Sequence, residues 1–239
     1  MRFEQRGCGR STGREGPFTI GQAVDDLEQV RNALGISRWA VLGNSWGAEL
    51  ALRYAAHHPG RTSTVAYIAG VGAGDEFREA YVAARDRRLG LDRRRWQELG
   101  GRIRTTAEER EWCLLQWRPD FSTSRDPEAN AQALWRTRPA GVEVNARANR
   151  ELRADRRTTE LLALGTAVHV PVVMVFGADD PRPWTATDDL VAALPHVRRV
   201  VLDRAGHAPW IERPADVRAI ILHVLKAGPV ELSAGTYRR

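Results

Sequence analysis

The sequence has two cysteines, one lysine and no long apolar run, and each shortage excludes a class of protein. Cys8 and Cys113 lie far apart and outside any CxxC pattern, so by themselves they cannot form a disulfide framework or a metal site. No stretch of 18 or more apolar residues occurs, and the first ten residues, MRFEQRGCGR, contain no apolar run of signal-peptide length. We therefore expect a cytoplasmic protein with no membrane partner.

The positive charge is spread along the chain and does not form a basic block. The formal net charge is +6, and because Lys226 is the only lysine, nearly all of the positive charge is arginine. In RDRRLGLDRRRW and RELRADRRTTE the arginines alternate with acidic residues, as on solvated helix faces. Binding to phosphates requires clustered cations, so we expect no nucleic-acid partner.

What is present is a pattern of alternating strands and helices. Apolar residues at three- and four-residue steps predict an amphipathic helix over 18–34, closed by Gly35. A short apolar run at 38–43 and a helical pattern at 48–58, stopped by Pro59, follow directly. The apolar positions of the first helix are Ile20, Val24, Leu27, Val30, Ala33 and Leu34.

Three more strands are predicted after this helix pair. The runs 64–71 and 170–177 are continuously apolar, as expected for parallel strands covered on both faces, and VRRVVLD (197–203) is the third. A last helix begins near Pro214 and includes VRAIILHVL. Residues 75–165 have helical patterns and no β-branched apolar runs. We therefore expect an α/β fold, with a mostly parallel, doubly wound sheet formed by 1–74 and 166–239 and a helical cap at 75–165.

The motif GNSWG (43–47) marks Ser45 as a candidate nucleophile. In a nucleophile elbow, a serine occupies a strained turn between a strand and a helix. Glycines flank it because side chains at Gly43 and Gly47 would clash with the neighbouring strand and helix. The predicted strand before the motif and the predicted helix after it are the context that the motif requires.

A serine nucleophile needs a base and a carboxylate to orient that base. FGADDP places Asp179 and Asp180 just after one predicted strand, and RAGHAPW places His207 just after the next. Parallel strands deliver such residues to one edge of the sheet. Singly, each residue is more typical of a turn or loop; together they predict a triad. The other histidines lack this position at a strand end: His57, His58, His169, His196 and His223.

These segments resemble the prolyl iminopeptidases of the α/β-hydrolase superfamily. EQRGCGRS resembles the DQRGxGxS segment of that family, GNSWGAELALRYAAHHP its elbow and following helix, and GADDPRP and RAGHAPW its acid and histidine loops. The resemblance covers most of the chain outside 75–165. It implies Ser45 as nucleophile, His207 as base and Asp180 as the acid, with Asp179 as the second choice.

The resemblance also implies a reaction. It is hydrolysis of an amide or ester through an acyl-enzyme, without cofactor, with the backbone N–H of Trp46 as one oxyanion donor. The partner would be a small molecule or a short peptide, amino-terminal proline peptides among them, although an arylesterase or amidase activity fits equally well. A haloalkane dehalogenase would need an aspartate at position 45, which Ser45 excludes.

One departure from the family concerns the oxyanion hole. The family has an HGGPG loop before its DQRG segment that supplies the second oxyanion donor, and this chain contains no such loop. Loss of one donor typically lowers the rate roughly 10²- to 10³-fold. The missing third strand would also leave the strand at 38–43 at an open edge. We expect a truncated gene or a misplaced start, with a natural protein extending upstream by some tens of residues. The alternative is a catalytically impaired fragment or a binding protein.

A second departure concerns the cap. The family holds the amino group of its substrate with acidic residues near tryptophans, and no such motif can be aligned here. Two roles stay open for the cap tryptophans, namely packing of helix on helix and lining of a pocket. The residues concerned are Trp96, Trp112, Trp117 and Trp135, with Glu109, Glu111 and Glu143.

Overall fold

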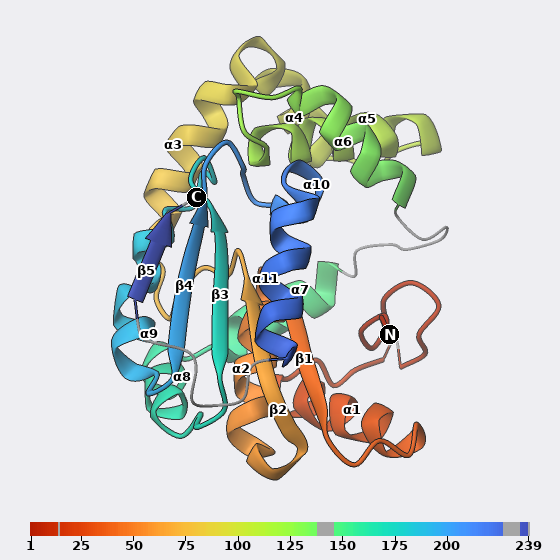
Figure 1. The fold of residues 1–239 in the computed structure, drawn as a ribbon. Coiled ribbons are helices and arrows are strands. Elements are labelled where there is room, and N and C mark those ends of the chain that lie inside the picture. Colours follow the sequence, from red (N-terminus) through yellow and green to blue (C-terminus); the bar gives the residue numbers. More distant parts are fainter. Residues whose placement is uncertain (14, 138–145, 227–234, 239) are drawn as a thin grey trace.

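A parallel sheet lies at the centre of the computed structural model, which describes residues 1–13, 15–137, 146–226 and 235–238 (Figure 1). The strand order within the sheet equals the order along the chain, and all four pairings are parallel. This confirms the predicted fold class. The strands are β1 (Trp39–Asn44), β2 (Thr62–Ile68), β3 (Val172–Gly177), β4 (Val197–Leu202) and β5 (Gly235–Arg238).

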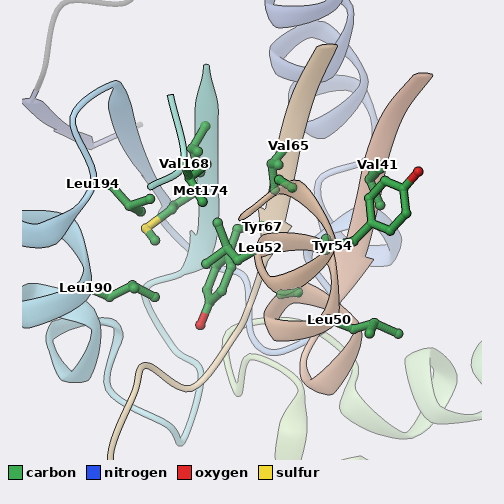
Figure 2. Close-up of a cluster of buried hydrophobic side chains, with 14 of the residues drawn as sticks. Val41, Leu50, Leu52, Tyr54, Val65, Tyr67, Val168, Met174, Leu190 and Leu194 are labelled. Carbon is green, nitrogen blue, oxygen red and sulfur yellow. The ribbon is translucent and has the colours of Figure 1, made fainter. Parts of the chain in front are cut away.

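Helices cover both faces of the sheet. Along β3, alternate side chains point to opposite faces, so that Met174 packs against α2 and α9 while Val173 and Val175 pack against α11. Figure 2 shows the first of these clusters, in which Leu52 of α2 lies beside Tyr67 of β2. The helices on the first face are α1 (Ile20–Ala33), α2 (Trp46–His57), α8 (Thr158–Thr166) and α9 (Asp188–Ala193), and α11 (Pro214–Lys226) lies on the second.

Between β2 and β3, the part of the chain that the structure describes forms helices and no strand. α3 to α6 stand beyond the carboxyl ends of the strands (Figure 1). α7 and α8 return to the core, where Leu152 packs against Phe18 and Leu161 joins the cluster on the sheet. The division of the chain into core and cap stays a prediction. The further helices are α3 (Phe77–Leu89), α4 (Arg93–Gly100), α5 (Thr106–Trp117), α6 (Pro127–Thr137) and α7 (Ala146–Asp155).

The first helix matches its prediction in its ends and in half of its apolar face. Gly35 has φ +65°, and the N–H of Ile36 bonds the carbonyl of Arg31 at 3.2 Å, which is a Schellman end. The expected burial of Leu34 is wrong, because 49% of this residue is exposed. Arg31 is buried instead, where it forms an ion pair with Glu28.

Two features of the sheet edges bear on the sequence analysis. β1 forms one edge of the described sheet, and Leu42 in that strand is 46% exposed. β5, at the other edge, was not predicted, because the segment GTYR has no apolar run. Within the described residues, no helix combines the length and the apolar character needed to cross a membrane.

Candidate active site

Ser45 lies in a strained turn between β1 and α2. Its backbone has φ 55° and ψ −119°, and residues with a side chain rarely adopt a positive φ. Its N–H donates a hydrogen bond to the carbonyl of Ile68 at 2.9 Å. A Cβ added at Gly43 would lie 1.8 Å from the carbonyl oxygen of Gly47, so that glycine is required by close packing. The predicted clash at Gly47 is wrong, because a Cβ there would meet nothing within 4 Å.

Asp180 and His207 are in contact at the carboxyl ends of neighbouring strands. Asp180 Oδ2 lies 2.6 Å from His207 Nδ1, and the Asp180 side chain is 2% exposed. Burial by itself raises the pKa of Asp180, but the imidazole of His207 and the guanidinium of Arg182 together hold it below its usual value. The carboxyl is therefore an ionised acceptor for the imidazole N–H.

The second candidate acid has a different partner. The Asp179 carboxylate accepts a hydrogen bond from Ser122 Oγ, and the Asp179 carbonyl accepts one from Arg88 Nη2 at 2.8 Å. Of the two adjacent carboxylates, only Asp180 forms a hydrogen bond with the imidazole among the described residues. The geometry thus distinguishes between two residues that the sequence left as first and second choices.

The histidine loop lies beside the elbow. Asn44, which precedes Ser45, donates its Nδ2 hydrogen to the carbonyl of His207 at 3.4 Å and to that of Ile68 at 3.2 Å. No hydrogen bond within the described residues joins Ser45 Oγ to the His207 ring. In hydrolases this bond often tightens only in the complex with substrate. The structure therefore brings Asp180 and His207 into contact, and it places the loop of His207 next to the turn that carries Ser45.

A segment before α6 packs tightly on the histidine loop. The N–H of His207 bonds the carbonyl of Asp120 at 2.7 Å, and a Cβ at Gly206 would lie 2.1 Å from that same oxygen. Asp120 also forms an ion pair with Arg182 at 2.8 Å. Sequence reasoning missed both residues. Arg182 could have been suspected, because it lies two positions after the predicted acid, whereas nothing in the sequence indicates Asp120.

Glu212, in the short helix α10 (Pro209–Glu212), is a further missed residue. Its carboxylate accepts a hydrogen bond from the N–H of Gly206 at 2.6 Å and another from the N–H of Ser122 at 2.8 Å. Burial raises the pKa of Glu212 above its ordinary value, although both N–H groups act in the opposite direction. This carboxylate thus connects the histidine loop to the segment before α6.

A cavity of about 560 Å³ opens beside Ser45 and Trp46. Trp46 is the first residue of α2, where backbone N–H groups have no partner within the helix, so its N–H is suited to stabilise an oxyanion. α3 contributes Tyr81, whose ring carries the Arg182 guanidinium at 4.0 Å from its centroid. The charged residues of the lining are Glu49, Asp75, Arg78, Arg85, Arg153, Arg156 and Arg182.

The tryptophans and glutamates named from the sequence pack elsewhere. Trp96 donates to Gln116 at 2.9 Å, and the Trp117 and Trp135 rings lie 6.3 Å apart. Arg104 lies 4.3 Å from the centroid of the Trp112 ring and pairs with Glu109, while Glu111 pairs with Arg95. Among the described residues, none of these tryptophans and glutamates lines the cavity at Ser45. Glu143 lies outside the described residues.

Comparisons with known proteins agree with the fold. The sequence profile of the alpha/beta hydrolase fold matches residues 2–214. Proline iminopeptidase of Neisseria gonorrhoeae is 29% identical over 248 residues, which are 90% of this chain and 76% of that protein. Proline iminopeptidase of Xylella fastidiosa (strain 9a5c) is 51% identical over 63 residues, but the match spans only 26% of this chain and 20% of that protein.

A solved structure extends the comparison to the fold. An alpha/beta fold family hydrolase from Bacillus anthracis str. Sterne superposes with a TM-score of 0.70, covering 92% of this chain and 80% of that one at 19% identity. At this identity the similarity concerns the fold alone.

Proposed function

Because the chain belongs to the α/β-hydrolase fold family and is similar to proline iminopeptidases, we propose that it is a serine hydrolase that forms an acyl-enzyme at Ser45. The observation that carries the proposal is the contact between His207 Nδ1 and Asp180 Oδ2 at 2.6 Å, beside a strained turn that presents a serine. The substrate would be a small amide or ester.

In the proposed reaction each residue has one task. His207 Nε2 takes the proton of the Ser45 hydroxyl as its oxygen attacks the carbonyl carbon. Asp180, ionised and buried, accepts the Nδ1 hydrogen and stabilises the imidazolium. The backbone N–H of Trp46 donates to the oxyanion. The imidazolium then protonates the leaving group, and water attacks the acyl-enzyme by the same sequence of proton transfers.

The test is labelling by a fluorophosphonate probe, which reacts with an activated serine. We expect Ser45→Ala and His207→Ala to abolish labelling. Ser37→Ala is the matched control, because Ser37 is an exposed serine outside the cavity, and it should label like the wild type. Persistent labelling of the Ser45→Ala protein would refute the assignment of the nucleophile.

A second pair of variants separates the two aspartates. Asp180→Asn should lower the labelling rate by about 10⁴-fold, because the amide favours the wrong tautomer of the imidazole. Asp179→Asn should lower it far less, because the Asp179 side chain bonds Ser122. The reverse order would make Asp179 the acid.

Turnover of prolyl 4-nitroanilide and of 4-nitrophenyl esters tests the reaction itself. The prolyl anilide is chosen because the relatives are proline iminopeptidases. The esters are chosen because the sequence left an esterase activity open. A folded protein that turns over neither, and that labels no faster than free serine, would be the binding protein or impaired fragment.

A further inference from the structure

The cavity beside Ser45 has more cationic than anionic side chains in its lining. Five arginines and two carboxylates line it. Charges at a partly enclosed surface interact more strongly than in bulk water, because the protein side has a low dielectric constant. The charge of the cavity therefore bears on which substrates enter it.

The deeper of the two carboxylates is shared by two arginines. Glu49, one turn after Ser45, accepts hydrogen bonds from Arg53 Nε at 3.0 Å and from Arg156 Nε at 2.6 Å. Two further carboxylates lie near these arginines, and both are largely exposed. The Asp75 side chain is 65% exposed and lies 3.7 Å from Arg156. The Glu160 side chain is 48% exposed and lies 3.2 Å from Arg53. Exposed partners are screened by water, so the buried part of this cluster retains a positive charge.

Two other arginines of the lining, Arg182 and Arg85, are neutralised by carboxylate partners. Arg182 pairs with Asp120 at 2.8 Å and with Asp180 at 3.4 Å, and Arg85 pairs with Asp86 at 2.7 Å. These two guanidiniums are therefore held in place and are poorly available to a ligand.

Arg153 differs from the other arginines of the lining. Its side chain is exposed and forms no ion pair or hydrogen bond with any described residue. Arg153 lies in the last turn of α7 and Arg156 directly follows the end of that helix, and both line the cavity. Among the described residues, the cavity thus has one guanidinium without a partner, beside a second whose charge is only partly compensated.

We propose that this hydrolase acts on substrates whose acyl group carries a carboxylate, which Arg153 binds while Arg156 adds a second positive charge. The planar donors of a guanidinium match the two oxygens of a carboxylate. The inference rests on the proposed function, since it concerns the acyl group transferred to Ser45. It also disfavours an amino-terminal proline substrate, whose ammonium group would meet positive charge.

The experiment compares two esters of 4-nitrophenol with the same six-carbon acyl chain. The adipate monoester ends in a carboxylate, and the hexanoate ester ends in a methyl group. We expect the wild type to have the higher kcat/KM for the adipate ester. Arg153→Gln should lower this value about tenfold, as for loss of a charge-assisted hydrogen bond, and should change hydrolysis of the hexanoate ester less than twofold.

The matched control is Arg157→Gln. Arg157 is a neighbouring, exposed arginine that does not line the cavity, so its removal changes the net charge equally and should leave both rates unchanged. A preference for the hexanoate ester in the wild type would overturn the proposal, as would an equal effect of both substitutions.

Binding separates this inference from the proposed function. The Ser45→Ala protein is titrated calorimetrically with both esters, which it cannot turn over. If the wild type hydrolyses neither ester but the Ser45→Ala protein binds the adipate ester more tightly, and Arg153→Gln removes this preference, the anion site stands and the proposed reaction fails. Equal binding of the two esters overturns the anion site.

Discussion

Removal of the Glu212 carboxylate should destabilise the protein and slow the reaction. The side chain is buried, with 4% of the residue exposed, and its two oxygens accept the N–H groups of Gly206 and Ser122. An alanine at this position leaves both N–H groups buried without these acceptors. A glutamine keeps one acceptor oxygen, so one of the two N–H groups retains its partner. Its amide NH2 group faces the other N–H, which therefore loses its acceptor.

The contacts set the size of the effect. Each buried donor left without a partner costs about 1–3 kcal/mol, so Glu212→Ala should lower the free energy of unfolding by about 2–6 kcal/mol and Glu212→Gln by about half as much. Domains are typically stable by about 5–15 kcal/mol, so the glutamine variant is the one suited to kinetics. Glu98→Gln, at an exposed glutamate of α4, is the control and should change stability by less than about 0.5 kcal/mol.

Urea denaturation followed by tryptophan fluorescence measures this effect, and its pH dependence tests the cause. Burial raises the pKa of Glu212 above 4.5 in the folded state, so the folded protein holds this proton more tightly than the unfolded chain. The contribution of the group to stability therefore falls as the pH rises through 4.5 and the raised pKa, and is constant above. The advantage of the wild type over Glu212→Gln should shrink as the pH rises above 4.5 and through the raised pKa of Glu212. An advantage that grows over this range would refute the reasoning.

The kinetic result separates positioning from simple destabilisation. If Glu212 holds the loop of His207, Glu212→Gln should lower kcat with little change in KM under conditions where the variant is fully folded. A folded variant with the kcat of the wild type would show that this carboxylate has a structural role only.

Two further predictions concern the elbow and the first helix. Gly43→Ala should lower the rate of Ser45 labelling by about 10²-fold, because its Cβ would overlap the Gly47 carbonyl and displace the turn, whereas Gly47→Ala meets open space and should label normally. A hydrogen bond from Arg31, aided by Tyr54, lowers the pKa of Glu28 from 4.5 to about 2. Glu28→Gln should therefore be less stable than the wild type at neutral pH, and thermal melts should show this difference vanishing as the pH falls from 4.5 to about 2.

The parts of the fold that the sequence predicted are those determined by local pattern. Runs of mainly apolar residues identify β2 and β3, because strands buried on both faces carry few polar side chains. The positions of Asp180 and His207 follow from the same fact, since parallel strands end at one edge of the sheet. β5 has no such run, and its pairing with β4 is a tertiary contact that composition does not reveal.

The missed parts of the site depend on contacts between distant segments. Ser122 and Glu212 are 90 positions apart, and Glu49 and Arg156 are 107 apart. In the sequence, Arg156 belongs to a run of alternating charges that is typical of a solvated helix face. Only the tertiary contact with Glu49 of α2 places it in the cavity, so no periodicity could have assigned it.

These long-range contacts make the segment before α6 part of the environment of the triad. The carbonyl of Asp120 accepts the N–H of His207, and its carboxylate holds Arg182, which in turn lies against Asp180. The same guanidinium packs on Tyr81 of α3, which lines the cavity. A displacement of α3 or of this segment by substrate would therefore change both the position of the imidazole and the charge beside its carboxylate. The side chains of Tyr81, Arg182, Asp120 and Asp180 thus form a continuous series of contacts from the cavity lining to the carboxylate that holds the imidazole.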